Sequence, residues 1–129
     1  MRDRTMGRFL VVGWIALGLA LAGCAGDSEP ELVLSPAAEG GRQLIETEGC
    51  AACHGGDGRG VVGPRLAGLI GSEVEMEDGT TLIADEAYIR RSIQDPQADL
   101  RAGFSVRMPV NNLTDDEIDD VIAYLRELP

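Results

Sequence analysis

The run Cys50-Ala51-Ala52-Cys53-His54 constrains the fold of this chain more than any other part of its sequence. Two cysteines at this spacing can form thioether bonds to the two vinyl groups of a haem, and the adjacent histidine then lies under the iron as its proximal ligand. Because a porphyrin holds its vinyl groups at fixed positions relative to the iron, the three residues need a fixed spacing too. We therefore expect one covalently bound haem c, attached at Cys50 and Cys53 and ligated by His54.

A redox dithiol and half of a zinc site are the two other uses of such a cysteine pair. A thioredoxin-like dithiol needs a βαβ context, which the pattern of the sequence does not offer. A zinc site needs further ligands, and the chain holds only three cysteines and one histidine. Haem attachment is therefore the better interpretation of the motif.

The first 23 residues have the pattern of an export signal. Three arginines among the first eight residues form a positive segment, and an apolar stretch over residues 9–22 follows. This stretch is shorter than the roughly 20 residues that a membrane-spanning helix needs. The run Leu21-Ala22-Gly23-Cys24 resembles the lipobox of bacterial lipoproteins, which are cleaved before the cysteine once its thiol carries a lipid.

We therefore expect residues 1–23 to be a cleaved lipoprotein signal and Cys24 to carry the lipid. Acyl chains at Cys24 would hold the exported protein on the extracytoplasmic face of a bacterial membrane without spanning it. An ordinary secretory signal and a short uncleaved anchor are the alternatives. Export itself favours the haem interpretation, since haem is joined to such proteins outside the cytoplasm.

Composition limits the partners and the size of the fold. The chain has 129 residues, enough for one domain. Its formal net charge is −11, and all of its basic residues other than His54 are arginines, since it contains no lysine. Such an acidic protein is not expected to bind nucleic acid, which requires a basic surface.

The rest of the chain is expected to form a flexible tether followed by one mostly α-helical domain. Residues 24–36 are polar and rich in turn formers, and the folded domain is expected over 37–129. Its first predicted helix covers 37–47, with Leu44 and Ile45 buried, and ends at Gly49. The glycine-rich segment 50–64 is expected to be a loop.

The second half of the domain is predicted to hold a small hairpin and two helices. Segments 74–77 and 80–83 alternate in polarity around a turn at Asp78-Gly79, which predicts the hairpin. A helix is expected over 85–93, and a loop over 97–113. Thr114 and Glu117 fit a capping box at the start of the last helix. The apolar face of this helix is expected to consist of Ile118, Val121, Ile122, Leu125 and Leu128.

The sixth coordination position of the iron has one strong candidate ligand. His54 is the only histidine, so a second histidine from the same chain cannot bind. Met76 lies on the same hairpin face as Val74 and is expected to be a packing residue. Met108 precedes Pro109 in a loop, where an extended backbone suits a segment laid over one haem face. We expect Met108 to be the ligand, the alternative being an ordinary apolar loop residue, and a thioether ligand raises the reduction potential.

Several further motifs now make the chain resemble a known family. The haem motif, Gly63-Pro64-Arg65-Leu66, Met108-Pro109 and a C-terminal helix with Tyr124-Leu125 resemble those of a class I cytochrome c. Segments 63–69, 71–74, 78–80, 84–90 and 92–96 are similar to the cytochrome c domain fused to subunit II of certain bacterial cytochrome c oxidases. The resemblance implies a small helical bundle around one haem, with the hairpin as an insertion. It also implies that the Pro64 carbonyl orients the His54 ring and that Leu66 packs beside the haem.

The resemblance implies a single-electron carrier rather than an enzyme, with redox proteins of a respiratory chain as its partners and no small-molecule substrate. A position between a membrane reductase and a terminal oxidase is expected. A fixed haem subunit of an oxidase or dehydrogenase complex is the alternative, and a ligand sensor with an open sixth site would require that Met108 does not bind iron. The acidic residues at 115–120 are interpreted as a solvated helix face rather than a docking patch.

Overall fold

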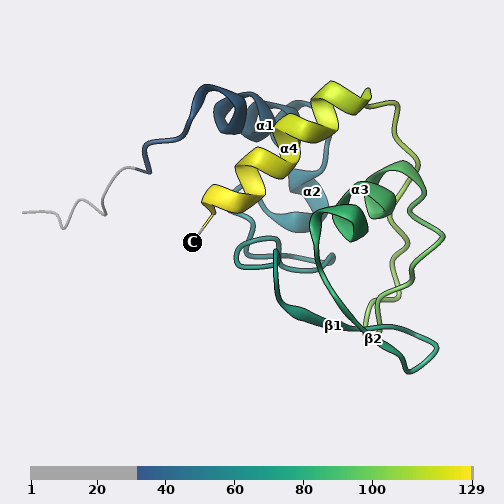
Figure 1. Cartoon of the computed structure of the whole chain (residues 1–129). Helices are drawn as coiled ribbons and strands as arrows, with labels where there is room; N and C mark the ends of the chain where they lie inside the picture. The colour runs from purple at the N-terminus through teal and green to yellow at the C-terminus, as the bar shows by residue number, and fades with distance from the viewer. Residues whose placement is uncertain (1–31, 129) are drawn as a thin grey trace, which may run out of the picture. The chain divides into compact units, whose positions relative to one another are not determined.

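The computed structural model describes residues 32–128 (Figure 1). These residues contain four helices and one two-stranded hairpin, connected by loops. The predicted signal and Cys24 lie outside these residues, as does most of the predicted tether. None of the helices within residues 32–128 has both the length and the apolar character needed to cross a membrane. The elements in chain order are α1 (Pro36–Thr47), α2 (Ala51–His54), β1 (Glu73–Glu75), β2 (Thr81–Ile83), α3 (Glu86–Gln94) and α4 (Asp115–Glu127). This arrangement confirms the predicted class, a mostly α-helical fold with a small hairpin.

Helices α1 and α4 lie against each other and bring the two ends of the domain together (Figure 1). Ser35 caps α1 by accepting a hydrogen bond from the amide of Ala38, and Pro36 occupies the first turn, where its missing N–H costs nothing. Gly41 allows the close crossing, because a Cβ there would lie 2.0 Å from the carbonyl oxygen of Asp120 in α4. Ile45 is buried as predicted, but Leu44 is only partly buried and packs against the core from outside it.

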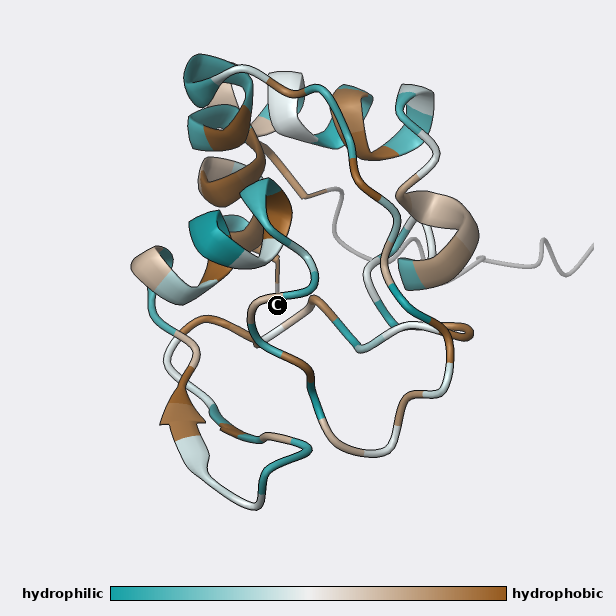
Figure 2. Ribbon diagram, turned by 90° about the vertical axis from the view of Figure 1, so that its right-hand side faces the viewer, coloured by the Kyte–Doolittle hydropathy of each residue, from teal (hydrophilic) through white to brown (hydrophobic). Residues whose placement is uncertain are grey.

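The last helix forms as its sequence predicts. The Thr114 hydroxyl accepts a hydrogen bond from the amide of Glu117, and the Glu117 carboxylate accepts one from the amide of Thr114. All five residues of the predicted apolar face are buried, and Tyr124 is buried with them. Hydrophilic and hydrophobic residues alternate along the helices in Figure 2, as expected where one face of a helix packs on a core.

The predicted hairpin is also confirmed. Strands β1 and β2 pair antiparallel with Val74 opposite Leu82, and Gly79 in the turn has a φ of +84°, which favours glycine. Met76 is 5% exposed, so it packs in the core as expected. Helix α3 follows, capped by the Asp85 side chain, with Ile89 and Ile93 buried. Both helix boundaries differ from the predicted range by one residue.

One prediction for the middle of the chain is wrong. The segment 50–64 was expected to be a loop throughout, but residues Ala51–His54 form the single turn of helix α2. Gly49 and Gly55 bound this turn, both with positive φ, and the two alanines between them favour helix. The amide of His54 donates to the Cys50 carbonyl oxygen at 3.0 Å. The glycines on either side of α2 therefore begin and end this helical turn and do not prevent it from forming.

Candidate functional site

All six residues that the sequence singled out for haem binding line one cavity of about 390 Å³. Its walls come from α2, α3, α4, the end of α1, and the segments 63–69 and 96–113. Residues far apart in sequence therefore meet at one site. The six are Cys50, Cys53, His54, Pro64, Leu66 and Met108.

Helix α2 sets the spacing of the two thiols and the imidazole. Cys50 and Cys53 lie one helical turn apart, and both are free, partly buried thiols. Burial raises the pKa of the Cys50 thiol. A redox-active cysteine needs a lowered pKa and a stabilised thiolate, so this environment gives no support to the dithiol alternative.

The loop after α2 folds back over the histidine and orients it. The Nδ1 atom of His54 donates a hydrogen bond to the carbonyl oxygen of Pro64 at 2.8 Å. The carbonyl oxygen of Cys53 accepts bonds from three successive amides, those of Val61, Val62 and Gly63, at 2.9–3.2 Å. A Cβ at Gly63 would lie only 3.2 Å from Cε1 of His54, so a glycine at this position leaves room for the imidazole ring. With Nδ1 engaged, Nε2 is the nitrogen that can bind iron.

The structure separates the two candidate methionines. Met108 is partly buried, lines the same cavity as His54, and packs against the core. Its carbonyl oxygen accepts a hydrogen bond from Nε2 of Gln97 at 3.0 Å, which ties Met108 to the segment that follows α3. Met76 lies outside the cavity, on the hairpin. Of these two methionines, only Met108 therefore lines the cavity that holds His54.

Helix α3 and the segment after it contribute cavity residues that the sequence did not single out. Tyr88 and Ser92 lie on the face of α3 that lines the cavity, one turn apart. The four-residue spacing of Ile89 and Ile93 predicts a buried face on α3 and could have indicated them. Arg101 also lines the cavity, and no local pattern marks it.

The lining of the cavity fits haem c. Apart from the thiols, the imidazole and the thioether, its walls are largely apolar, with Leu66, Leu69 and Leu125 among them. The hydroxyl of Ser92 lines it as the one buried side-chain oxygen or nitrogen in residues 32–128 that has no hydrogen-bond partner. Across that same range, no three His, Cys, Asp or Glu side chains gather as they would around a free metal ion, so the zinc alternative gains no support.

Comparison with known proteins agrees with this geometry. The family model described as Cytochrome c matches residues 38–129, which include all but the first two residues of α1, the rest of the fold through α4, and every residue of the cavity named above. A comparison with curated proteins gave no match.

Proposed function

Because the chain belongs to the cytochrome c family, whose members carry electrons on a covalently bound haem c, we propose that it is a lipid-anchored, monohaem carrier with His54 and Met108 as axial ligands. The convergence of both cysteines, His54, Pro64 and Met108 on one cavity carries the proposal. When bound, the haem supplies an iron that changes between ferrous and ferric states by one electron.

The residues of the chain each have a role in this proposal. Cys50 and Cys53 hold the porphyrin, while the Pro64 carbonyl fixes the tautomer and orientation of His54 and strengthens it as a ligand. Met108, which lines the same cavity, would supply the sixth ligand of the iron, and Leu66 would help exclude water. A site closed on both sides changes charge with little movement, which suits electron transfer better than catalysis.

Absorption spectra of the haem-loaded protein test the ligation. We expect a weak far-red band from sulfur to ferric iron, and no response of the ferrous protein to carbon monoxide. Met108→Leu keeps the volume but removes the thioether, so the band should disappear, carbon monoxide should bind and the reduction potential should fall. Met76→Leu is the matched control, because Met76 lies outside the cavity, and its spectra and potential should match the wild type.

Two results would contradict this ligation. If Met108→Leu kept the band and the potential, Met108 would not be a ligand. If the wild-type ferrous protein were five-coordinate and bound carbon monoxide, the site would be that of a ligand binder or sensor, and the carrier function would be refuted.

The membrane anchor rests on the sequence around Cys24, which lies outside the described residues. Cys24→Ser should move the exported protein from the membrane fraction to the soluble fraction without changing its haem spectrum, because the two sites are in separate segments. A Cys24→Ser protein that stayed in the membrane fraction after a high-salt wash would exclude lipidation as the anchor.

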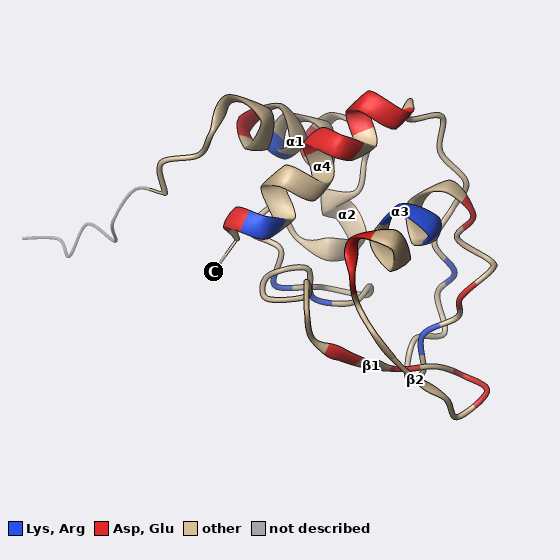
Figure 3. Cartoon of the chain, viewed as in Figure 1, with Lys and Arg blue, Asp and Glu red and all other residues tan. Residues whose placement is uncertain are grey.

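The proposed partners are respiratory redox proteins, between a membrane reductase and a terminal oxidase. Figure 3 shows acidic residues on the first turns of α4 and along the hairpin. Val106 and Val110 line the cavity yet are 53% and 76% exposed. These exposed valines suit a small apolar contact with a partner, whereas an acidic partner surface would be repelled. Tethering would raise the effective concentration of the carrier near such partners. Co-purification through a high-salt wash would instead indicate a fixed subunit.

A further inference from the structure

The arginines of the domain differ in whether they have an acidic partner. Residues 32–128 contain eight arginines, and six of them form ion pairs with carboxylates of the same segment. In an acidic protein, an arginine left without a carboxylate is the exception. The six paired residues are Arg42, Arg59, Arg90, Arg91, Arg107 and Arg126. Arg65 and Arg101 are the two exceptions.

Only one of these two arginines reaches the cavity. Arg65 is exposed, does not line the cavity, and donates from Nε to the carbonyl oxygen of Ala67 at 2.9 Å. Arg101 is partly buried and lines the cavity, with its guanidinium carbon 5.7 Å from the centre of the Phe104 ring, which lines it too. Arg107 also lines the cavity, but both of its terminal nitrogens bind the Glu77 carboxylate, at 2.7 and 3.0 Å.

The hairpin holds the backbone of Arg101 in place. Arg101 forms an antiparallel bridge with Met76, directly after β1. The amide of Glu77 donates to the carbonyl oxygen of Leu100 at 2.8 Å, and the amide of Ala102 donates to that of Glu75 at 2.9 Å. Residues 100–102 therefore lie along the hairpin and pair with it through this isolated bridge. Because Met76 is buried in the core, this edge is anchored to the rest of the domain.

A haem presents two propionate carboxylates on the edge of the macrocycle opposite its vinyl groups. With the thioethers at α2, the propionates must point toward the part of the cavity wall that is remote from α2. Figures 1 and 2 both show the hairpin, to which Arg101 is tied, apart from α2. Glu48 and Asp99 line the cavity as well, and they would repel a propionate, although Asp99 is already paired with Arg91. Of the two arginines that line the cavity, Arg101 is the one that forms no ion pair within residues 32–128, so it is available to a propionate.

We propose that Arg101 binds a haem propionate and that the hairpin is the element that positions it. The inference rests on the haem binding proposed above. The planar guanidinium matches a carboxylate with two parallel hydrogen bonds, and its stacking near Phe104 limits its motion. A positive charge held beside the haem also favours the ferrous state, whose net charge is one unit lower than that of the ferric state.

Replacement of Arg101 in the haem-loaded protein tests this role. Arg101→Gln should shift the propionate bending band in the resonance Raman spectrum and lower the reduction potential. Arg65→Gln is the matched control, since it removes the same charge away from the cavity, and it should leave the Raman band in place with a smaller change in potential. Arg101→Lys keeps the charge but loses the planar pair of donors, so it should shift the band while keeping most of the potential.

The outcomes separate this inference from the proposed function. If Arg101→Gln left the propionate band where it is in the wild type, or if Arg65→Gln had the same effects, the propionate role would be overturned. If Arg101→Gln failed to mature, the band of Arg101→Lys would decide in the same way. Failure of the wild-type protein to attach haem would instead overturn the proposed function itself.

Discussion

Replacing Gly41 by alanine should destabilise the domain by about 2 kcal/mol. A Cβ at Gly41 would lie 2.0 Å from the carbonyl oxygen of Asp120 and 2.9 Å from Cβ of Tyr124. The nearer obstacle is backbone, so α1 and α4 would have to separate. Overpacking costs about 1–3 kcal/mol, and a backbone obstacle puts this site at the upper end. The better helix propensity of alanine offsets about 0.5–1 kcal/mol of that cost.

Thermal unfolding of the haem-loaded protein, followed by far-ultraviolet circular dichroism, measures this loss. A domain of this size changes its Tm by about 4–8 °C per kcal/mol, so Gly41→Ala should lower Tm by about 8–16 °C. Gly40→Ala is the matched control on the same helix. The nearest atom to a Cβ at Gly40 is the Asp120 carboxylate oxygen Oδ2 at 3.1 Å, which can rotate away, so this variant should gain stability from helix propensity.

Either of two results would refute the reasoning. If Gly41→Ala melted at or above the wild-type temperature, the two helices would not cross as closely as the structure shows. If Gly40→Ala and Gly41→Ala lost stability equally, the effect would come from the helix interior and not from the contact with α4.

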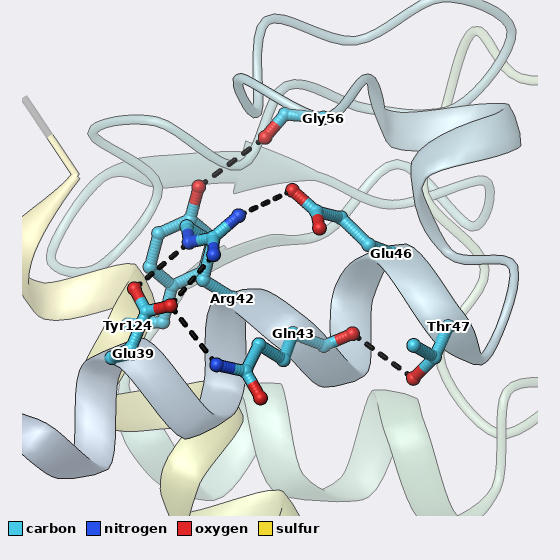
Figure 4. A network of polar contacts seen from close by, with 7 residues as sticks. All are labelled: Glu39, Arg42, Gln43, Glu46, Thr47, Gly56 and Tyr124. Atoms are coloured by element: carbon cyan, nitrogen blue, oxygen red, sulfur yellow. Dashed lines mark hydrogen bonds and ion pairs between the residues drawn. The ribbon is translucent and has the colours of Figure 1, made fainter.

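Two further predictions concern the hydrogen-bonded pairs Thr114–Glu117 and Glu39–Arg42. Thr114→Ala removes the acceptor for the Glu117 amide and should cost about 1 kcal/mol in the free energy of unfolding measured by urea denaturation, and an unchanged urea midpoint would show that the cap is dispensable. Hydrogen bonding to Arg42 (Figure 4) lowers the pKa of Glu39 from 4.5 to about 2. The folded state therefore favours the charged carboxylate, so the stability that it contributes is present above about pH 4.5 and is lost as pH falls through about 2. The urea midpoint of Glu39→Gln should lie below that of the wild type at pH 6 and converge with it near pH 2, whereas Glu73→Gln, at an exposed position in β1, should track the wild type throughout.

The elements that could be predicted from sequence are those whose signals are local. The capping box at Thr114, the turn at Asp78-Gly79 and the spacing of Ile89 and Ile93 each involve residues within four positions of one another. All three produced the predicted element. Helix α2 was missed because glycines on both sides of it indicate a loop, although they in fact end a single helical turn.

The candidate site was predictable only as far as its motifs extend. Residues 50–54 indicate haem attachment by themselves, and the small number of possible ligands, with the position of Met108 before Pro109, led to the expectation for Met108, which lines the cavity. The positions of Ser92 and Arg101 beside the cavity depend instead on how α3 and the hairpin fold against distant segments. A lone serine in a helix and one of the eight arginines in residues 32–128 carry no local signal of that placement.

The cavity also explains how a chain with so few aromatic residues forms a stable domain. Ile45, Leu69, Ile89 and Leu125 belong to the hydrophobic core and line the cavity at the same time. A haem bound in this cavity would therefore complete the hydrophobic core, and covalent bonds to Cys50 and Cys53 would keep that part of the core from dissociating.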